Sequence, residues 1–280
     1  MGLSDQQVER YQRHILLKEI GGPGQQKLAQ AKVLLVGMGG LGNPAGQYLA
    51  AAGVGHLGLV DDDVVSLSNL QRQTLFCADD VGAAKVTVAA RALNKINPHS
   101  HITAHEARVT AETIEAVLHD YDVIVDGSDN FATRFLLNDH CFRAQKTLIT
   151  GAVGRFDGQV SCFKAWLKDS DGTPLPCYRS LVPDPPEIEE DCATTGIIGA
   201  LTGVIGSLMA VEVIKEITGA GDSLAGRLLI YDGLSATART VKLNWDPKTQ
   251  ITAVVQKPNR ARHSVTRGRA VGGHRPKSEY

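Results

Sequence analysis

A glycine-rich turn behind a short apolar strand is the first place in this sequence where residue types and spacing could do chemistry. The apolar run KVLLV at 32–36 leads directly into GMGGLG at 37–42, which has the G-x-G-x-x-G spacing of dinucleotide-binding turns. Glycine lets a backbone turn tightly and approach an anion, and the helix expected at 43–52 would offer unpaired N–H groups to a phosphate. A second strand, at 56–60, ends at Asp61, which is placed to hydrogen-bond a ribose hydroxyl. The pattern predicts an adenine nucleotide site, with NAD as the default ligand, whose turn is formed by Gly37, Gly39, Gly40 and Gly42.

Two basic residues further along the chain change the expected ligand. Arg72 follows the acidic cluster, and Lys85 opens the next expected helix, at 85–97. A dinucleotide has one pyrophosphate, which the backbone N–H groups of the turn already serve, so two added cations suit a triphosphate. The sequence therefore favours ATP over NAD.

The stretch that carries these residues resembles a known family. The string D-x-D-x4-S-N-L-x-R-Q at 61–73 resembles the MoeB/ThiF/HesA family of adenylyltransferases, which are bacterial relatives of ubiquitin-activating enzymes. The resemblance covers the chain from residue 8 to about residue 245. It implies a homodimer that uses ATP and Mg²⁺ to adenylate the C-terminal glycine of a small ubiquitin-fold sulfur carrier ending in Gly-Gly, with release of pyrophosphate.

Two strings bear on the branch of the family. SLSNLQRQTL at 66–75 and GVIGSL at 203–208 look closest to the MoeB branch, which activates a MoaD-like carrier, the small subunit of molybdopterin synthase, in molybdenum cofactor biosynthesis. The nearest alternative is ThiF-like activation of a ThiS-like carrier for thiamine synthesis.

The resemblance also assigns site residues, position by position. Those that it places on the nucleotide are Gly37, Gly39, Gly40, Gly42, Asp61, Asp63, Ser68, Asn69, Arg72, Gln73, Lys85, Asp129 and Asn130. Those that it places in catalysis are Arg13, Arg72, Lys85, Asp129 and Cys192. The nucleophile would be a carboxylate, which is already ionised at neutral pH, so the reaction requires no catalytic base.

Asp129 lies in an acidic turn after the apolar strand YDVIVD at 121–126. Such a turn at the carboxyl end of a parallel strand faces the ligand crevice. A triphosphate beside carboxylates needs a cation to relieve the repulsion, so we expect Asp129 to bind Mg²⁺. The alternative is that Asp129 caps the helix that begins at Asn130.

Arg13 and Cys192 have roles that only the resemblance implies. Arg13 lies on the helix expected at 8–17, and in the family an arginine of this helix reaches the ATP phosphates of the partner subunit. An exposed helix charge is the alternative. Cys192 follows the acidic, proline-rich stretch 183–191, where a family cysteine can carry a thioester or acyl-disulfide with the carrier. A packed thiol without a covalent role is the alternative.

Zinc is not expected. Many family members hold a structural zinc ion between two C-x-x-C pairs. This chain has Cys177 in the first pair but Ser180 in place of its second cysteine, and the stretch 245–250 contains no cysteine. One thiolate of four cannot build the tetrahedral site.

The order of the expected elements predicts an α/β fold. Strands and helices alternate up to the strand at 148–152, and consecutive strands follow at 158–163, 227–232 and 240–243. This order indicates a Rossmann-like, doubly wound mixed sheet with a parallel N-terminal half and an antiparallel C-terminal half. We expect one ThiF-type adenylation domain over 1–255 and a basic, disordered tail at 256–280.

Composition excludes several other classes of protein. The net charge of −1 is the sum of +6 over residues 257–280 and −7 over residues 1–256, and the acidic body argues against a nucleic-acid-binding protein. Five scattered cysteines and a start without a signal-peptide pattern predict a cytoplasmic protein. The uncharged run 193–211 is rich in glycine and continues amphipathically, so we expect a buried helix and no membrane span.

Two rival functions share part of these features. An NAD-dependent oxidoreductase would keep the glycine turn and Asp61 but would have no use for Arg72, Lys85 and Asp129 together. A non-catalytic scaffold, like the inactive half of heterodimeric activating enzymes, usually loses the phosphate-binding cations that this chain keeps.

Overall fold

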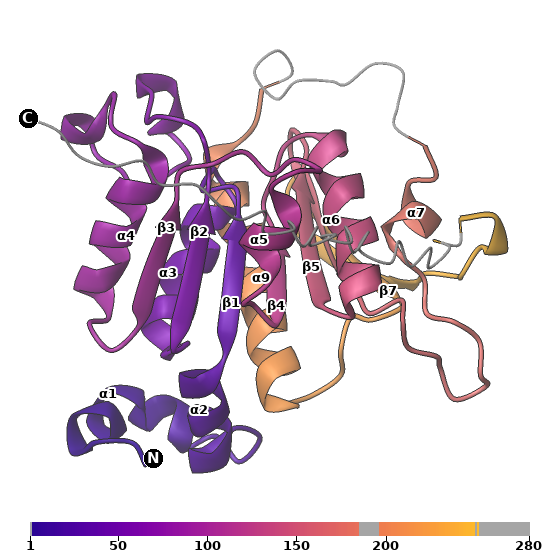
Figure 1. Ribbon diagram of the computed structural model, residues 1–280, viewed down its shortest axis with the longest axis horizontal. Coiled ribbons are helices and arrows are strands. Elements are labelled where there is room, and N and C mark those ends of the chain that lie inside the picture. The colour runs from indigo at the N-terminus through magenta and orange to yellow at the C-terminus, as the bar shows by residue number, and fades with distance from the viewer. Residues whose placement is uncertain (1, 185–195, 250, 252–280) are drawn as a thin grey trace, which may run out of the picture.

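One eight-stranded sheet organises the chain, in the strand order β3-β2-β1-β4-β5-β6-β7-β8 (Figure 1). The computed structural model describes residues 2–184, 196–249 and 251. The strands are β1 (Lys32–Val36), β2 (His56–Val60), β3 (His101–His105), β4 (Val123–Asp126), β5 (Thr147–Val153), β6 (Asp157–Phe163), β7 (Arg227–Asp232) and β8 (Thr237–Lys242). Strands β1 to β5 pair in parallel, and β6, β7 and β8 are added antiparallel. The predicted mixed sheet is confirmed.

Helices cover both faces of the parallel half. The α-helices of the described residues are α1 (Asp5–Ile15), α2 (Gly21–Gln30), α3 (Gly42–Ala52), α4 (Lys85–Ile96), α5 (Ile114–Leu118), α6 (Phe131–Ala144), α7 (Tyr178–Leu181) and α9 (Gly199–Thr218). Alternate residues of β1 point to opposite faces, so Val33 and Leu35 join a core cluster with α3, α4 and α9, whereas Leu34 joins a second cluster with α5 and α6. A strand segment buried on both faces must be apolar, which explains why residues 33–36 are all valine or leucine.

The strand order reverses between β1 and β4. β1 pairs with β2 on one side and with β4 on the other, so the chain leaves the carboxyl ends of these two strands toward opposite sides of the sheet. Ligands of such sheets bind in the crevice that opens at this point. Helices α1 and α2 lie at the opposite, amino ends of the strands (Figure 1).

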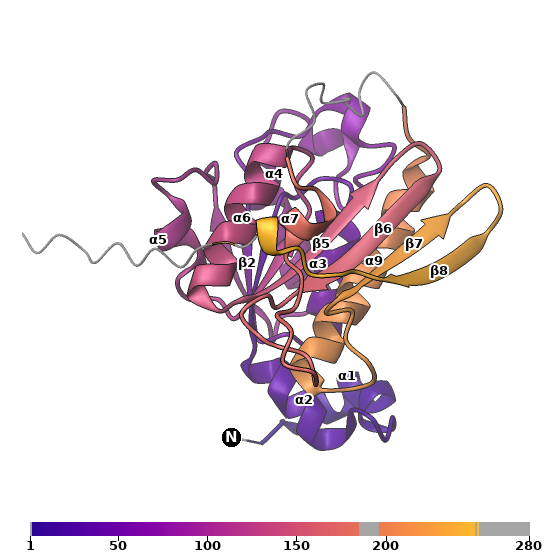
Figure 2. The ribbon, with the colours of Figure 1, turned by 90° about the vertical axis from the view of Figure 1, so that its right-hand side faces the viewer.

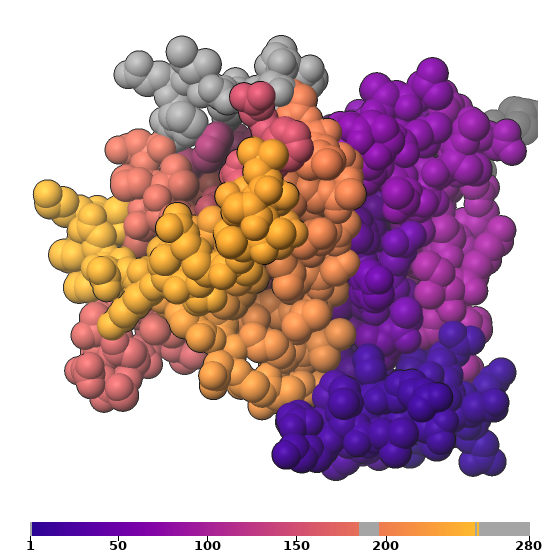
Figure 3. Space-filling model, turned by 180° about the vertical axis from the view of Figure 1, so that it is seen from behind, coloured from indigo at the N-terminus to yellow at the C-terminus, as the bar shows by residue number. Residues whose placement is uncertain are grey.

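The antiparallel half projects from the helix layers. The β7–β8 hairpin extends beyond α9 in the side view (Figure 2), and every residue of β8 is exposed. From behind, the orange surface of the α9 region separates the yellow C-terminal strands from the purple N-terminal half (Figure 3). Helix α9 packs closely on the start of α3, because a Cβ atom at Gly206 would lie 2.6 Å from the carbonyl oxygen of Leu41.

Some helix boundaries differ from the sequence expectation. The first helix begins at Asp5 instead of residue 8, because Ser4 caps it in a capping box with Gln7. Helix α5 begins only at Ile114, because the Thr113 hydroxyl donates to the carbonyl of Arg108 and holds 110–113 in turns. Helix α9 is described from Gly199, and no helix among the described residues is long and apolar enough to cross a membrane. The predicted tail at 256–280 lies outside the described residues.

The contact between Gly58 and Tyr121 gives a test of this packing. A Cβ atom at Gly58 would overlap the Tyr121 ring, whereas a Cβ atom at Gly203, inside α9, meets nothing within 4 Å. We expect Gly58→Ala to lower the free energy of unfolding by about 1–3 kcal/mol through overpacking. We expect Gly203→Ala to be neutral or to raise it by about 0.5–1 kcal/mol, because alanine suits a helix interior better. Urea denaturation measures both, and equal effects would contradict the packing.

Candidate functional site

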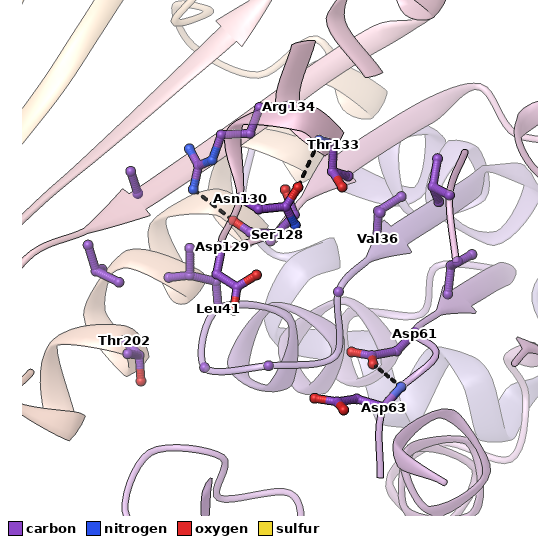
Figure 4. A pocket seen from close by; sticks show the side chains of 18 of the residues that line it. Val36, Leu41, Asp61, Asp63, Ser128, Asp129, Asn130, Thr133, Arg134 and Thr202 are labelled. Carbon is purple, nitrogen blue, oxygen red and sulfur yellow. Dashed lines mark hydrogen bonds between the residues drawn. The ribbon is translucent and has the colours of Figure 1, made fainter. Parts of the chain in front are cut away.

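A cavity of about 580 Å³ lies at the carboxyl ends of β1, β2 and β4, where the strand order reverses. The glycine turn, the end of β2, the loop after it and the start of α6 contribute its walls (Figure 4). Of the residues assigned to the nucleotide from the sequence, those that line it are Gly37, Gly39, Gly40, Asp61, Asp63, Asn69, Arg72, Gln73, Lys85, Asp129 and Asn130. Residues far apart in the sequence therefore meet in one crevice.

The glycine turn has backbone contacts that other residues would not allow. Gly37 has φ +88°, and a Cβ atom there would lie 2.9 Å from the carbonyl oxygen of Gly127, at the end of β4. A Cβ atom at Gly42 would overlap the carbonyl oxygen of Gly37. Gly39 differs, because a Cβ atom there meets only the Gln73 amide nitrogen, at 3.7 Å. Gly37 and Gly42 therefore shape the turn, and Gly39 keeps its cavity side clear.

Asp61 holds the glycine turn. Its Oδ2 accepts the N–H of Met38 at 2.7 Å, and its Oδ1 accepts the N–H of Asp63 at 2.9 Å. Burial raises the pKa of the Asp61 carboxyl, and the two backbone hydrogen bonds and Lys85 oppose that rise. A carboxylate has about four acceptor positions, so these two bonds leave capacity for a ribose hydroxyl.

Both predicted cations line the cavity. The Lys85 amine lies 2.7 Å from Asp63 Oδ2, with its own side chain only 6% exposed. The Arg72 guanidinium donates to the carbonyl of Ser68 at 3.1 Å, one turn earlier. Lys85 is the first residue of helix α4. The start of this helix therefore places the Lys85 side chain at the cavity wall.

Three neighbours of Arg72 have different surroundings. Asn69 accepts the N–H of Ser66 at 3.1 Å and closes the 3₁₀ turn Leu67–Asn69. Gln73 is 97% buried (3% exposed), and its Oε1 has no hydrogen-bond partner among the described residues. Ser68 is not among the residues that line the cavity, and its hydroxyl instead lies 3.1 Å from that of Ser66.

The start of α6 separates the roles of two adjacent residues. Asn130 is the N-cap, because its Oδ1 accepts the N–H of Thr133 at 2.9 Å. Asp129 is exposed, lines the cavity, and makes no hydrogen bond or ion pair with another described residue (Figure 4). The alternative reading of Asp129 as the helix cap is wrong, and its carboxylate faces solvent in the crevice.

Sequence reasoning missed Arg134. This residue is 8% exposed, lines the cavity, and donates from Nη2 to the carbonyl of Ser128 at 2.7 Å (Figure 4). It makes no ion pair with a described carboxylate. Its position in the sequence could have indicated this role, because residue 134 lies one helical turn after the cap at Asn130 and so on the same face of the helix.

One predicted catalytic residue, Arg13, lies far from the cavity, and another, Cys192, is outside the described residues. Arg13 is exposed on α1, which lies at the amino ends of the strands, at the opposite end of the sheet from the cavity (Figure 1). It cannot serve the cavity of its own chain in this arrangement. Cys192 lies outside the described residues, so its covalent role stays a prediction.

Comparison with known proteins agrees with this geometry. The model of the ThiF family matches residues 11–252. The chain is 45% identical over 249 residues to the SAMP-activating enzyme E1 of Haloferax volcanii (88% of this chain, 89% of that protein). It is 43% identical over 253 residues to the sulfur carrier protein adenylyltransferase of Thermus thermophilus (90% and 93%).

Further matches are partial or distant. Adenylyltransferase and sulfurtransferase MOCS3 of Drosophila grimshawi is 47% identical over 243 residues, which span 86% of this chain but only 53% of that protein. The crystal structure of E. coli MccB with ATP superposes with a TM-score of 0.69 at 24% identity, over 85% of this chain and 72% of that one. At that identity the likeness concerns the fold alone.

Two glycines of the turn separate ligand binding from folding. We expect Gly39→Ala to fold normally but to weaken ATP binding by about tenfold, or about 1.4 kcal/mol, because its methyl group enters the cavity. We expect Gly42→Ala to lower the melting temperature, because its methyl group would overlap the backbone of Gly37. Calorimetric titration and thermal melting measure the two effects. Normal ATP affinity in Gly39→Ala would place the nucleotide elsewhere.

Proposed function

The chain belongs to the ThiF family, and from this premise we propose that it adenylates, in the cytoplasm, the C-terminal glycine of a small ubiquitin-fold sulfur carrier ending in Gly-Gly. One observation carries the proposal: Arg72 and Lys85 line the same cavity as the glycine turn and Asp61. The names of two relatives that match along most of their length, a sulfur carrier protein adenylyltransferase and a SAMP-activating enzyme, support the choice of substrate.

The reaction needs positioning and charge stabilisation more than it needs acid–base chemistry. An oxygen of the carrier's C-terminal carboxylate attacks the α-phosphorus of ATP and forms the acyl–phosphate bond. The bond from the α-phosphorus to the bridging oxygen breaks, and pyrophosphate leaves with the electron pair. Asp61 orients the ribose, and Arg72 and Lys85 stabilise the charge on the phosphates.

Magnesium fits the side chain of Asp129. Its exposed carboxylate in the crevice is a hard oxygen ligand of the kind that Mg²⁺ prefers. Bound there, Mg²⁺ would neutralise negative charge on the phosphates.

Arg134 suits the other substrate. A buried guanidinium that makes no ion pair with a described residue favours a carboxylate in the same cavity. We assign it the attraction and orientation of the carrier's C-terminal carboxylate before attack. This assignment fits its place in the first turns of α6, where its guanidinium lies against the carbonyl of Ser128 at the cavity wall.

The zinc site of other family members does not fit this chain. The Cys177 thiol donates to the carbonyl of Thr249 at 3.8 Å, and the hydroxyls of Ser180 and Thr249 lie 3.3 Å apart. These three groups offer one thiol and two hydroxyls, so hydrogen bonds join the two segments that zinc would otherwise bridge. We propose that this chain folds without zinc.

The identity of the carrier that this chain activates determines to which branch of the family it belongs. We propose a MoaD-like carrier and a role in molybdenum cofactor biosynthesis, on the strength of the strings at 66–75 and 203–208. Activation of a purified ThiS-like carrier and not of a MoaD-like carrier would assign the chain to thiamine synthesis instead.

Exchange of labelled pyrophosphate into ATP, measured with Mg²⁺ and carrier, tests the reaction. We expect Arg72→Ala and Asp129→Ala to lower the exchange rate by about 10³-fold, because each removes charge stabilisation at the phosphates. Arg143→Ala and Asp122→Ala, which change exposed residues of the same types outside the cavity, should leave it unchanged. Quenching of nicotinamide fluorescence without any exchange would support an oxidoreductase and contradict the proposal.

A second prediction concerns the homodimer and Arg13. We propose that Arg13 of one subunit completes the cavity of its partner, because α1 lies at the far end of its own sheet. Arg13→Ala and Arg72→Ala should each be inactive alone. Mixed and reassorted, they should regain about a quarter of wild-type exchange, because half of the dimers then hold one intact site of two. Activity in Arg13→Ala alone, or no recovery on mixing, would contradict this arrangement.

A further inference from the structure

The side chain of Asn43 connects two loops of the nucleotide site. It lies in the first turn of α3 and is fully buried, with 0% exposure. Its Nδ2 donates to the carbonyl of Met38 in the glycine turn at 2.8 Å, and its Oδ1 accepts the N–H of Leu75 at 2.9 Å. One amide therefore bridges the glycine turn and the loop that carries Arg72.

The glycine-turn end of this bridge is fixed on every side. The N–H of Met38 donates to Asp61, its carbonyl accepts from Asn43, and its side chain is fully buried in the core. Both backbone polar groups of the residue between Gly37 and Gly39 are thus held by side chains. The backbone of the turn has little freedom to move relative to α3.

The other end of the bridge belongs to a compact loop. The N–H groups of Arg72 and Gln73 both donate to the carbonyl of Asn69, at 3.0 and 2.9 Å. The N–H of Phe76 donates to the carbonyl of Gln73 at 3.1 Å. Because the loop is internally bonded, holding Leu75 also holds the backbone of Arg72 and Gln73.

Asparagine suits this position because it offers a donor and an acceptor on one short side chain. Aspartate would lack the donor, and leucine would lack both. Removing the amide leaves the buried carbonyl of Met38 and the partly buried N–H of Leu75 without this partner, which the loop can relieve by shifting.

We infer that Asn43 is a positioning residue, which sets the guanidinium of Arg72 against the phosphates that the glycine turn cradles. The inference rests on the proposed function, since it needs a triphosphate in the cavity. If Asn43 acts through Arg72, its loss lowers the affinity for ATP more than the affinity for AMP, because AMP lacks the β- and γ-phosphates.

The test is the ratio of ATP affinity to AMP affinity, measured by calorimetry on the full chain. Asn43→Leu, which keeps the branching of the side chain and removes both polar groups, should lower this ratio by roughly tenfold to a hundredfold, as expected for a misplaced clamp. In an Arg72→Ala background the same change should leave the ratio nearly unaltered. A purely structural role would lower both affinities together and would add to the effect of Arg72→Ala.

Two further variants keep the test decisive. If Asn43→Leu fails to fold, Asn43→Ala replaces it in the test. Alanine leaves space for a water molecule that can bond both backbone groups, so we expect the ratio to fall by a smaller factor. Ser161→Ala is the matched control, because its buried hydroxyl donates to the carbonyl of Arg227 between β6 and β7, outside the cavity. It should lower stability and leave the ratio unchanged.

The outcomes separate this inference from the proposed function. A wild-type protein that binds ATP no better than AMP would overturn the proposed function. A wild-type preference for ATP that Asn43→Leu retains, or an equal drop in the Arg72→Ala background, would overturn the inference alone.

Discussion

The site depends on a direct contact between two backbone segments, at Gly37 and Gly127, where neither residue has a side chain to keep them apart. Gly37, at the end of β1, lies so close to Gly127, at the end of β4, that a Cβ atom on either would come within 2.9–3.2 Å of the other's carbonyl oxygen. This approach brings the glycine turn and the acidic turn before α6 to the two sides of one crevice. The reversal of strand order makes the crevice, and the absence of side chains at Gly37 and Gly127 lets its two walls approach at the strand ends.

Acidic and basic side chains balance one another in the cavity, and the phosphates of ATP can take the place of an acidic partner in an ion pair. Its lining includes four acidic residues, Asp61, Asp62, Asp63 and Asp129, and four basic ones, Arg72, Lys85, Arg108 and Arg134. The Lys85 amine pairs with Asp63, whose side chain is 69% exposed, so phosphate oxygens can compete for that cation at little cost. Asp61 differs, because it is committed to the glycine turn by two backbone N–H groups. Asp61 thus supports the glycine turn, whereas Asp63 holds the Lys85 amine in place and Asp62 pairs with Arg108.

The sequence was sufficient for the sheet and for the residues that local pattern identifies. Buried parallel strands must be apolar throughout, so 32–36 and 56–60 were predicted to the residue. Arg134 and Asn43 could not be found in this way, because their partners are Ser128, Met38 and Leu75, and only the fold reveals which loops they join. The side chains of Asp129 and Asn130 can both accept a helix N–H, so only the structure shows that Asn130 is the cap.

A crystal structure with a non-hydrolysable ATP analogue and Mg²⁺ would show whether Arg72 and Lys85 hold the phosphates of ATP. We expect the triphosphate over the glycine turn, with the Arg72 guanidinium and the Lys85 amine within hydrogen-bond distance of its oxygens and the metal on Asp129. Phosphates bound elsewhere, with both cations directed to solvent, would contradict this expectation.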